Sequence, residues 1–403
     1  MNKIWFIITE FISSRKPIPS VVFWVVLIFV VIASVILIVN NSGSTIKLVP
    51  FYNDHLQVAA EIEMDSPYPL ALLTPTKVKG IYLTGYTFAS KKRRLELINL
   101  IKDTELNSVV IDFKDPAGKL MFKPILEQLK NWSVSPVALD YHDYQNILAD
   151  LQIAEIYTIA RITTFQDPTA VKIYSDLALK NNSGGVWSDY KGVTWLDMTN
   201  PQVWQLVASE AKEAAMIGFD EVQFDYIRFP SDGNTNKIKY FNFVSGQKKY
   251  KTITQFFKYL KSELSDLTIP LSIDLFGLTY QRRSDLDYDL NIGQRLADAA
   301  PYFDFISPMV YPSHYPSGFL GLASPAAHPY EIVSKALTEG NLILGNTTSS
   351  IASTRPWLQD FDLGADYNAS MVRAQIQAAD ENQASGWLLW NARNVYTIGA
   401  LEK

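Results

Sequence analysis

From residue 78 to the C-terminus, the apolar residues of this sequence alternate between two kinds of repeat. In some segments they recur at every second residue, as in strands, and in others every three to four residues, as in amphipathic helices. Eight strand segments alternate with helical ones over about 320 residues, without a change in composition. The predicted strands cover residues 81–86, 108–113, 156–162, a segment beginning at 221, 270–276, 304–311, 354–361 and 386–391.

The segments between these strands carry signals of helix starts. Asp167-Pro168 and Asn200-Pro201 each place a side-chain acceptor before a proline, which is typical of the first residues of a helix. Ser90 is a further candidate N-cap. Eight alternating strands and helices predict an α/β fold, a (β/α)8 TIM barrel. An open doubly wound sheet is the alternative, but no G-x-G-x-x-G motif follows the first strand.

Residues 21–39 form a long apolar run without a charge. Its 19 residues are enough to cross a hydrocarbon core of about 30 Å, so we expect a single N-terminal transmembrane helix. A cleaved signal peptide is the alternative, but its apolar core is only about 7–15 residues long and ends at a small-residue cleavage site. Residues 40–43, Asn-Asn-Ser-Gly, offer no such pattern, which favours an uncleaved anchor.

The charges that flank this run predict its orientation. Lys3, Arg15 and Lys16 precede it, and the cytoplasmic flanks of membrane helices are enriched in Lys and Arg. We therefore expect a single-pass membrane protein with residues 1–20 in the cytoplasm and its body outside. Residues 40–76 contain four prolines and little periodicity, which indicates a stalk, and 77–403 are the expected barrel domain.

The composition argues against several classes of function. The net charge is −5 and there is no long basic segment, so nucleic acid is not an expected partner. The chain has no cysteine, which excludes disulfides, thiolate metal sites and cysteine nucleophiles. Its four histidines lack the spacing of a helical ligand pair. We expect neither a metal nor a cofactor.

The segment 218–230, Gly-Phe-Asp-Glu-Val-Gln-Phe-Asp-Tyr-Ile-Arg-Phe-Pro, is typical of a strand that ends in functional residues. Glu221, Gln223 and Asp225 fall on one face of this strand, and apolar residues fall on the other. Strands of parallel α/β folds are covered on their faces, and their carboxyl ends carry the ligand site. Asp225 is therefore a catalytic candidate. Alternatively, its carboxylate caps the next helix or pairs with Arg228.

Two other predicted strands carry carboxylates near their carboxyl ends, Asp112 on the second and Asp274 on the fifth. Asp225 and Asp274 belong to consecutive strands, which lie about 4.8 Å apart in a sheet. Glycoside hydrolysis needs two such groups across the scissile bond, a protonated acid and a nucleophile or base. Crowding of carboxylates raises one pKa and so supplies the acid. Asp225 and Asp274 are the expected catalytic pair, and the sequence leaves open which is the acid.

Further polar and aromatic residues near the strand ends are candidates for binding a substrate. Arginines could hold a carboxylate ionised, and aromatic rings, including Tyr86, could stack on sugars. Core packing is the alternative for each tryptophan. Asp115 and the three carboxylates above could bind a hard cation, although their spacing does not favour one. The expected substrate-binding residues are Asp112, Arg161, Arg228, Tyr311, Trp357, Gln359 and Trp390.

Several motifs together resemble a known family. Residues 218–233, with 78–82, 112–115, 307–314 and 355–361, are similar to the putative glycosyl hydrolase domain family of bacteria, which resembles the α-amylase and chitinase-like barrels. The resemblance covers about residues 77–396. It implies a barrel with a carbohydrate-active role. Analogy with amylases implies a nucleophile at Asp225, while the glutamate acid usual on strand five is replaced here by Asp274.

These observations together predict a membrane-anchored glycoside hydrolase that faces away from the cytoplasm. We expect it to act on a polysaccharide of the cell envelope or the surroundings, through paired carboxylates. A non-catalytic polysaccharide-binding barrel is the alternative. A structural envelope protein is a third possibility, but it has no need of carboxylates at the strand ends. The sequence contains neither a G-x-S-x-G nucleophile elbow nor a phosphate-binding loop.

Overall fold

The computed structural model describes residues 45–48, 60–63, 68–115, 117–244 and 246–403, in two compact units, 1–67 and 68–403. In the first unit, β1 (Thr45–Leu48) pairs with β2 (Ala60–Glu63) in an antiparallel ribbon. The expected membrane segment 21–39 and the cytoplasmic segment 1–20 lie outside the described residues. In the part of the chain that is described, no helix is both long and apolar enough to cross a membrane.

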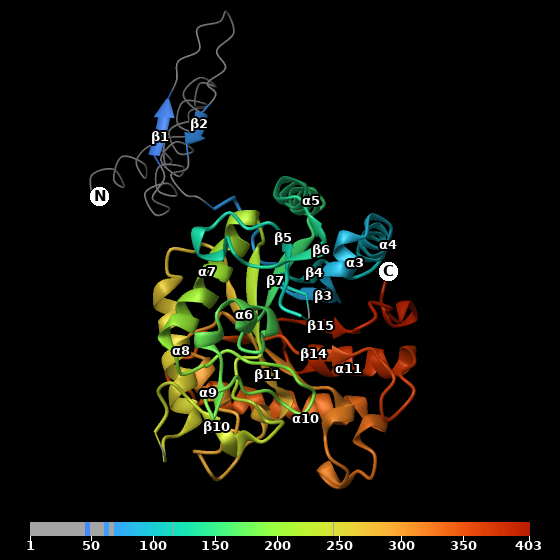
Figure 1. The fold of residues 1–403 in the computed structure, drawn as a ribbon. Helices are drawn as coiled ribbons and strands as arrows, with labels where there is room; N and C mark the ends of the chain where they lie inside the picture. The colour runs from blue at the N-terminus through green and yellow to red at the C-terminus, as the bar shows by residue number, and fades with distance from the viewer. Residues whose placement is uncertain (1–44, 49–59, 64–67, 116, 245) are drawn as a thin grey trace, which may run out of the picture. The chain divides into compact units, whose positions relative to one another are not determined.

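The second unit is a closed parallel barrel with eight strand positions, as the sequence predicts (Figure 1). Closure is complete because the last strand pairs with the first, for example Leu388 with Gly80. The seventh position is divided into two short strands around Arg355 and Pro356. In order, the strands are β3 (Val78–Leu83), β4 (Ser108–Asp112), β7 (Tyr157–Thr163), β9 (Glu221–Asp225), β11 (Leu271–Phe276), β12 (Phe305–Met309), β13 (Ser353–Thr354) with β14 (Trp357–Gln359), and β15 (Gly386–Trp390).

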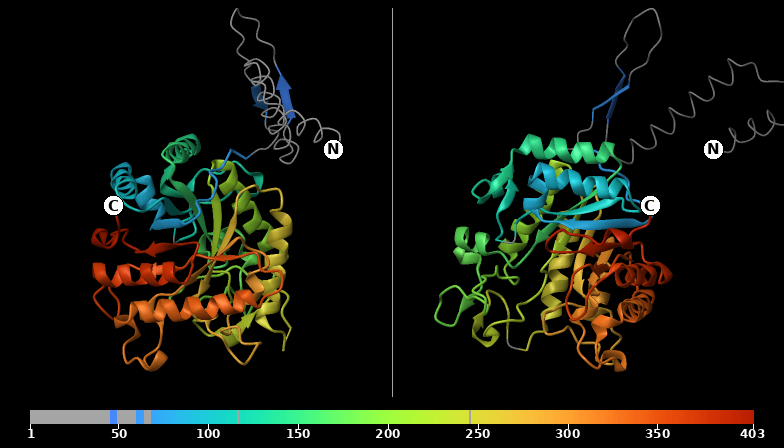
Figure 2. Two further views of the ribbon diagram at one scale, coloured as in Figure 1. Left: turned by 180° about the vertical axis from the view of Figure 1, so that it is seen from behind. Right: turned by 90° about the vertical axis from the view of Figure 1, so that its right-hand side faces the viewer.

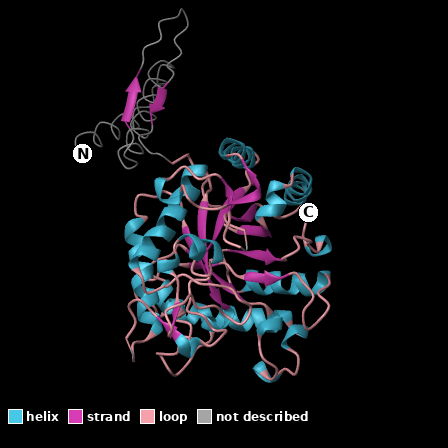
Figure 3. Cartoon of the chain, viewed as in Figure 1, coloured by secondary structure: helices cyan, strands magenta, loops and turns pink. Residues whose placement is uncertain are grey.

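Helices surround the strands on the outside of the barrel (Figures 2 and 3). They are α3 (Gly85–Ala89), α4 (Lys91–Lys102), α5 (Tyr141–Ile153), α6 (Pro168–Ile173), α7 (Pro201–Ile217), α8 (Lys249–Glu263), α9 (Leu296–Ala299), α10 (Pro329–Gly345) and α11 (Ala369–Glu381). Two small strand pairs lie in the loops between the barrel elements. Strand β5 (Leu120–Phe122) runs parallel to β6 (Val134–Leu139), and β8 (Lys180–Asn181) runs antiparallel to β10 (Ile238–Lys239).

The helix starts predicted at Asp167 and Asn200 are confirmed. Asp167 Oδ1 accepts a hydrogen bond from the Ala170 amide at 2.7 Å, and Asn200 caps α7 in a similar way. The prediction for the first strand was wrong at both ends. The strand begins at Val78, and Thr84 caps α3, so the strand ends before Tyr86.

The barrel unit also begins earlier than the predicted boundary at residue 77. Tyr68 is the first residue of the compact unit and is largely buried. The Leu72 amide donates to Asp220 Oδ1 at 2.7 Å, and the Thr74 hydroxyl lies 3.2 Å from that of Tyr157. Asp220 directly precedes β9, so this segment packs at the amino-terminal end of the strands.

Two apolar layers fill the barrel unit. The larger one lies between the strands and the helices and includes Val222, Phe224 and Ile273. The smaller one lies inside the barrel, and its buried members are Val78, Tyr82, Val110, Tyr157, Ile159, Tyr311, Trp357 and Leu388. Bulky inward side chains close the centre, as is usual for such barrels, so a ligand site is expected only at the carboxyl ends of the strands.

A buried ion pair crosses the centre of the barrel below those ends. Arg355, at the break in the seventh strand, donates to both carboxylate oxygens of Glu221, and neither side chain is exposed. The Ser272 hydroxyl donates to Glu221 at 2.5 Å and the Tyr157 hydroxyl at 3.1 Å. Every oxygen of this buried carboxylate therefore has partners, which offsets the cost of removing its charge from water.

Candidate active site

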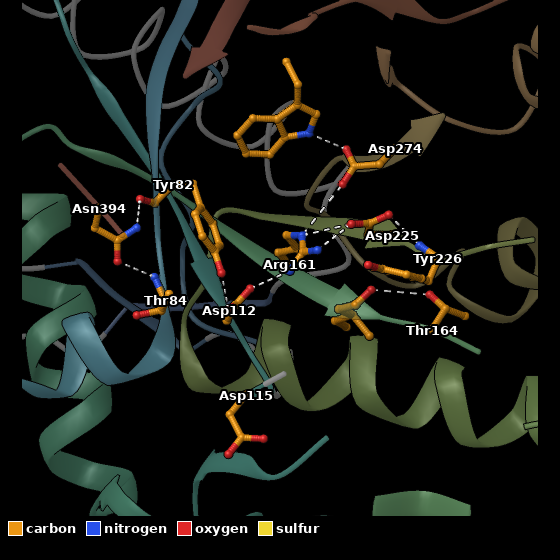
Figure 4. Close-up of polar contacts among 12 residues, drawn as sticks. Tyr82, Thr84, Asp112, Asp115, Arg161, Thr164, Asp225, Tyr226, Asp274 and Asn394 are labelled. Carbon is orange, nitrogen blue, oxygen red and sulfur yellow. Dashed lines mark hydrogen bonds and ion pairs between the residues drawn. The ribbon is translucent and has the colours of Figure 1, made fainter. Parts of the chain in front are cut away.

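Arg161 holds the three carboxylates of the strand ends together (Figure 4). Its Nη1 donates to Asp112 Oδ1 at 2.7 Å, and its Nη2 donates to Asp225 Oδ2 at 2.5 Å. Its Nε lies 3.2 Å from Asp225 Oδ2 and 4.0 Å from Asp274 Oδ2. Burial lowers the pKa of Arg161, but Asp225 and Asp112 outweigh it and raise that pKa well above its usual value. Arg161 therefore remains a cation at the centre of the cluster.

Strand register explains why these residues meet. Arg161 on β7 lies opposite Asp112 on β4. Thr163, two residues further along β7, lies opposite Asp225 at the end of β9. On the next strand Ile273 pairs with Phe224, so Asp274 and Asp225 are neighbours. Because side chains alternate between the two faces, all four polar side chains point into the barrel at its carboxyl end.

Asp274 lies in an environment that favours its protonated form. It is 1% exposed, and its Oδ1 accepts hydrogen bonds from Gln223 Nε2 and from Trp357 Nε1, both at 2.7 Å. Burial, followed by the nearby Asp225 charge, raises the pKa of Asp274 well above its usual value, and Arg161 reduces this effect. Asp274 therefore has the property of a general acid.

Asp225 has the partners of an ionised carboxylate. Its Oδ2 accepts from the Arg161 guanidinium, and its Oδ1 accepts from the Tyr226 amide at 2.6 Å. Tyr226 has a positive φ of 56°, a strained conformation for a residue with a side chain. Strain of this kind is often found at functional sites, where the surrounding structure maintains it. At this site it turns the chain sharply after β9.

The two catalytic candidates are close to one another. Since Arg161 Nε lies 3.2 Å from Asp225 Oδ2 and 4.0 Å from Asp274 Oδ2, these two oxygens are at most about 7 Å apart. Retaining glycosidases hold their two carboxyl groups about 5–5.5 Å apart, and inverting ones about 6.5–9.5 Å apart. The upper limit of about 7 Å for the Asp225–Asp274 oxygen distance includes the whole retaining range and only the lower edge of the inverting range.

A cavity of about 190 Å³ opens above this cluster. Among its lining residues are seven of the nine site residues predicted from the sequence. These seven are Arg161, Asp225, Arg228, Asp274, Tyr311, Trp357 and Trp390. Strands β7, β9, β11, β12, β14 and β15 and their following loops thus contribute to one concave site at the end of the barrel where such folds bind ligands.

Aromatic rings form one wall of this cavity. The Trp390 ring stacks on Tyr82, with centroids 4.0 Å apart and an interplanar angle of 19°, and meets Trp357 edge-on. Trp390 is half-buried, whereas Trp357 is only 1% exposed. Of the two alternatives for the tryptophans, core packing applies to Trp357 and lining of the cavity applies to Trp390. Trp357 packs in the inner core while its indole reaches Asp274, and Trp390 presents a surface to the cavity.

The remaining predicted residues lie elsewhere. Asp112 is behind Arg161 and accepts a hydrogen bond from the Tyr82 hydroxyl at 2.5 Å. Gln359 is fully buried away from the cavity, where its Oε1 accepts from the Ser313 amide at 3.2 Å. It thus supports the loop after β12.

Other polar candidates also have structural partners. Tyr86 does not line the cavity and donates its hydroxyl to Asp115 at 3.0 Å. Asp115 accepts two amides of its own turn, and Figure 4 shows it apart from the carboxylates around Arg161. In the described segments no group of three or more histidines and carboxylates is arranged to hold a metal ion. Arg228 forms no ion pair with Asp225 in the described part of the chain, so that structural alternative for Asp225 was wrong.

Some residues at the cavity were missed by the sequence reasoning. They are Tyr226, Phe276, Gln294 and Met309 in the lining, with Tyr82 and Gln223 behind it. Gln223 shares the parity of Asp225, which was an available signal. Gln294 carried no signal, because it is far along the chain and reaches the site by donating to the Ile227 carbonyl at 3.2 Å.

The model of a family described as "putative glycosyl hydrolase domain" matches residues 80–396, most of the chain. The chain belongs to this family. The match covers every strand of the barrel except the first two residues of β3. No curated protein matches the sequence significantly.

Solved structures show where the fold recurs. The glycoside hydrolase domain of PgaB (BpsB) from Bordetella bronchiseptica is 14% identical, with a TM-score of 0.54 over 78% of this chain and 93% of that one. The endo-1,4-β-D-mannanase from Thermotoga petrophila RKU-1 is 11% identical, with a TM-score of 0.51 over 78% and 88%. A hypothetical protein from Ruminiclostridium thermocellum ATCC 27405 is 32% identical over 48% of this chain and 96% of that one, with a TM-score of 0.43. The first two similarities establish a barrel fold shared with glycoside hydrolases.

Proposed function

We propose that this family member is an active glycoside hydrolase in which Asp274 is the general acid and Asp225 the nucleophile or base. One observation carries the proposal: two carboxyl groups, at most about 7 Å apart, face one cavity, and only Asp225 is hydrogen-bonded to the Arg161 guanidinium. Burial keeps the pKa of Asp274 high, while Arg161 pairs with the Asp225 carboxylate. Divergent environments of two carboxyls are the usual basis of acid and nucleophile roles in glycosidases.

The reaction follows from these assignments. Asp274 transfers its proton to the glycosidic oxygen as the bond from this oxygen to the anomeric carbon breaks, and the leaving sugar departs as an alcohol. Asp225 attacks the anomeric carbon and forms a glycosyl ester, because the upper limit of about 7 Å between the two carboxyl oxygens covers the whole retaining range. Ionised Asp274 then accepts a proton from water, whose oxygen attacks the anomeric carbon and releases Asp225. This second step restores both groups to their starting states.

The cavity suits one sugar unit held against an aromatic surface. Its volume of about 190 Å³ is below that of pockets for drug-sized ligands, which are about 300–1,000 Å³. Half-buried Trp390 and buried Tyr311, which follows β12, are both aromatic residues of the lining. We infer that the substrate is a polysaccharide of which one unit enters the cavity while the rest lies outside.

We further propose that residues 21–39 anchor the barrel at a membrane, with the catalytic domain outside the cytoplasm. The support is the uncharged apolar run and the Lys and Arg residues before it. A polysaccharide of the cell envelope or of the surroundings is then the accessible substrate.

A hydrolysis screen tests the proposed activity. The full chain in detergent and the compact unit from Tyr68 to Lys403 are incubated with neutral and acidic polysaccharides, and new reducing ends are measured. We expect release of reducing ends from at least one polymer, and loss of release in Asp274→Asn. If a polymer binds and raises the melting temperature but is not cleaved, the chain is a polysaccharide-binding barrel instead.

A further inference from the structure

Arg228 is the second arginine of the cavity, and it is held differently from Arg161. It follows β9 in the loop and lines the cavity. Its guanidinium lies over three rings, 5.0 Å from Trp195, 5.5 Å from Tyr226 and 5.4 Å from Phe276. The side chain is 8% exposed, so these rings leave only a small part of it open. Aromatic faces on several sides fix the plane of the guanidinium.

Only one nitrogen of this guanidinium has hydrogen-bond partners among the described residues. Nη1 donates to the Phe229 carbonyl and the Ser231 hydroxyl, both at 3.2 Å. Nε and Nη2 have no partner there. They are nevertheless partly accessible, unlike Arg355 Nε, which is fully enclosed without a partner. Nε and Nη2 form one edge of the planar group, which is the edge that binds a carboxylate with two parallel hydrogen bonds.

The charge of Arg228 is also uncompensated at contact distance. In the described ranges no carboxylate lies within 4.0 Å of it, whereas Arg161 and Arg355 both have such partners. Asp225 is engaged by Arg161, and the Asp274 carboxyl favours its neutral form. Asp189 and exposed Asp232 act only through longer-range attraction, and Asp189 Oδ1 accepts amides of its own turn.

A buried cation with a free edge is costly unless a partner arrives. Burial lowers the pKa of Arg228, but an arginine stays charged at neutral pH. A neutral sugar supplies hydroxyl acceptors, while an anionic group supplies two oxygens and the missing charge. The second match is the better one, because charge-assisted hydrogen bonds are about twice as strong as neutral ones.

We propose that Arg228 recognises an anionic substituent, a carboxylate or a phosphate, on the sugar in the cavity, so that the substrate is an acidic polysaccharide. This inference rests on the proposed hydrolase function, which it makes more specific. Arg228 would then determine specificity, while Asp225 and Asp274 carry out the reaction. The ring contacts hold the free edge of Arg228 in position before the substrate arrives, so little ordering is needed on binding.

The test compares acidic polymers with their neutral counterparts. Asp225→Asn protein, full-length and in detergent, is titrated with polygalacturonate, its methyl ester, a glycerol-phosphate teichoic acid and a neutral mannan. We expect binding to an acidic polymer, weakened by salt, and weaker binding to the neutral ones. Preference for polygalacturonate over its ester indicates a carboxylate, and preference for the teichoic acid indicates a phosphate.

Substitutions at Arg228 then assign the preference to this residue. In the Asp225→Asn background, Arg228→Gln should weaken binding of the preferred acidic polymer by about 10- to 150-fold and remove the difference from the neutral form. Arg228→Lys keeps the positive charge but cannot donate two parallel hydrogen bonds. Its affinity for the acidic polymer should therefore lie between those of the Arg228 protein and Arg228→Gln. Arg283→Gln, an exposed arginine outside the cavity, removes the same charge and should change nothing.

Three results separate the possible failures. A neutral polymer cleaved by the parent and bound as well as the acidic ones overturns the acidic substrate and leaves the hydrolase standing. An unchanged acidic preference in Arg228→Gln or Arg228→Lys, with a parental melting curve, overturns the role of Arg228. Acidic binding without cleavage by the parent overturns the hydrolase and retains the recognition site.

Discussion

The Trp357 indole donates a hydrogen bond to Asp274 Oδ1 at 2.7 Å, so a residue of the inner core directly contacts the proposed acid. This bond favours the ionised form of Asp274 and opposes the burial that raises its pKa. After burial, Asp225 and Arg161, Trp357 is therefore a further influence on the pKa of Asp274, and it limits the rise. The same contact explains why its ring is buried while its polar atom belongs to the site.

Trp357→Phe should move the alkaline limb of the pH profile of kcat to higher pH. Loss of the indole donor removes a bond to the ionised form and raises the pKa of Asp274 further. Because a general acid acts when protonated, the active form then persists to higher pH. Trp204→Phe is the control, since its indole donates to the Met198 carbonyl outside the cavity. A shift of the limb to lower pH would contradict the acid role of Asp274.

Trp390→Ala and Trp357→Ala should separate glycan binding from stability. Half-buried Trp390 faces the cavity, so its loss should weaken glycan binding by roughly 1–3 kcal/mol with a smaller effect on the melting temperature. Trp357 is almost fully buried, so its truncation should cost about 3–5 kcal/mol of unfolding free energy. Binding isotherms and denaturant unfolding measure the two effects. Unchanged glycan affinity in Trp390→Ala would remove Trp390 from the binding surface.

Arg355→Leu should destabilise the barrel strongly. It leaves the Glu221 carboxylate buried without its counter-charge, which typically costs about 3–5 kcal/mol. Lys130→Gln breaks an exposed pair with Glu127 and should cost about 0–1 kcal/mol. Urea unfolding of both variants checks the difference. Equal, small losses would mean that the central ion pair does not hold the barrel together.

Protease treatment of spheroplasts should degrade the barrel if residues 21–39 anchor it outside the cytoplasm. A cytoplasmic marker should survive the same treatment, and both should be degraded after lysis. Protection of the barrel until lysis would reverse the proposed orientation. A released form that lacks residues 1–39 would instead identify a cleaved signal peptide.

The alternation of strands and helices was readable because each strand keeps a buried outer face and each helix an apolar stripe. Residue parity also placed Glu221, Gln223 and Asp225 on the inward side correctly. The sequence could not predict whether Arg161 or Arg228 is the partner of Asp225. It depends on which residues of adjacent strands lie opposite one another, and sequence spacing does not contain that register.

The aromatic wall shows a second limit of the sequence. Tyr82 and Tyr86 both lie in the predicted first strand, and only Tyr86 was predicted to stack on a sugar. The Thr84 cap ends the strand between them, so Tyr82 points into the barrel while Tyr86 is carried away on α3. Likewise, Gln359 is at the carboxyl end of a barrel strand, but its side chain accepts a hydrogen bond from the Ser313 amide in the loop after β12 and does not line the cavity. Local hydrogen bonds of this kind decide direction and leave little trace in the residue pattern.

Turnover by Asp225→Asn tests the central claim most directly. The substitution keeps the size of the side chain and removes the charge that attacks the anomeric carbon, so hydrolysis of a polysaccharide cleaved by the parent should fall by orders of magnitude. Binding of the same polymer should persist, and exposed Asp103→Asn should retain full activity as the matched control. Near-parental turnover in Asp225→Asn, with an intact melting curve, would contradict the assignment of the chemistry to this carboxylate.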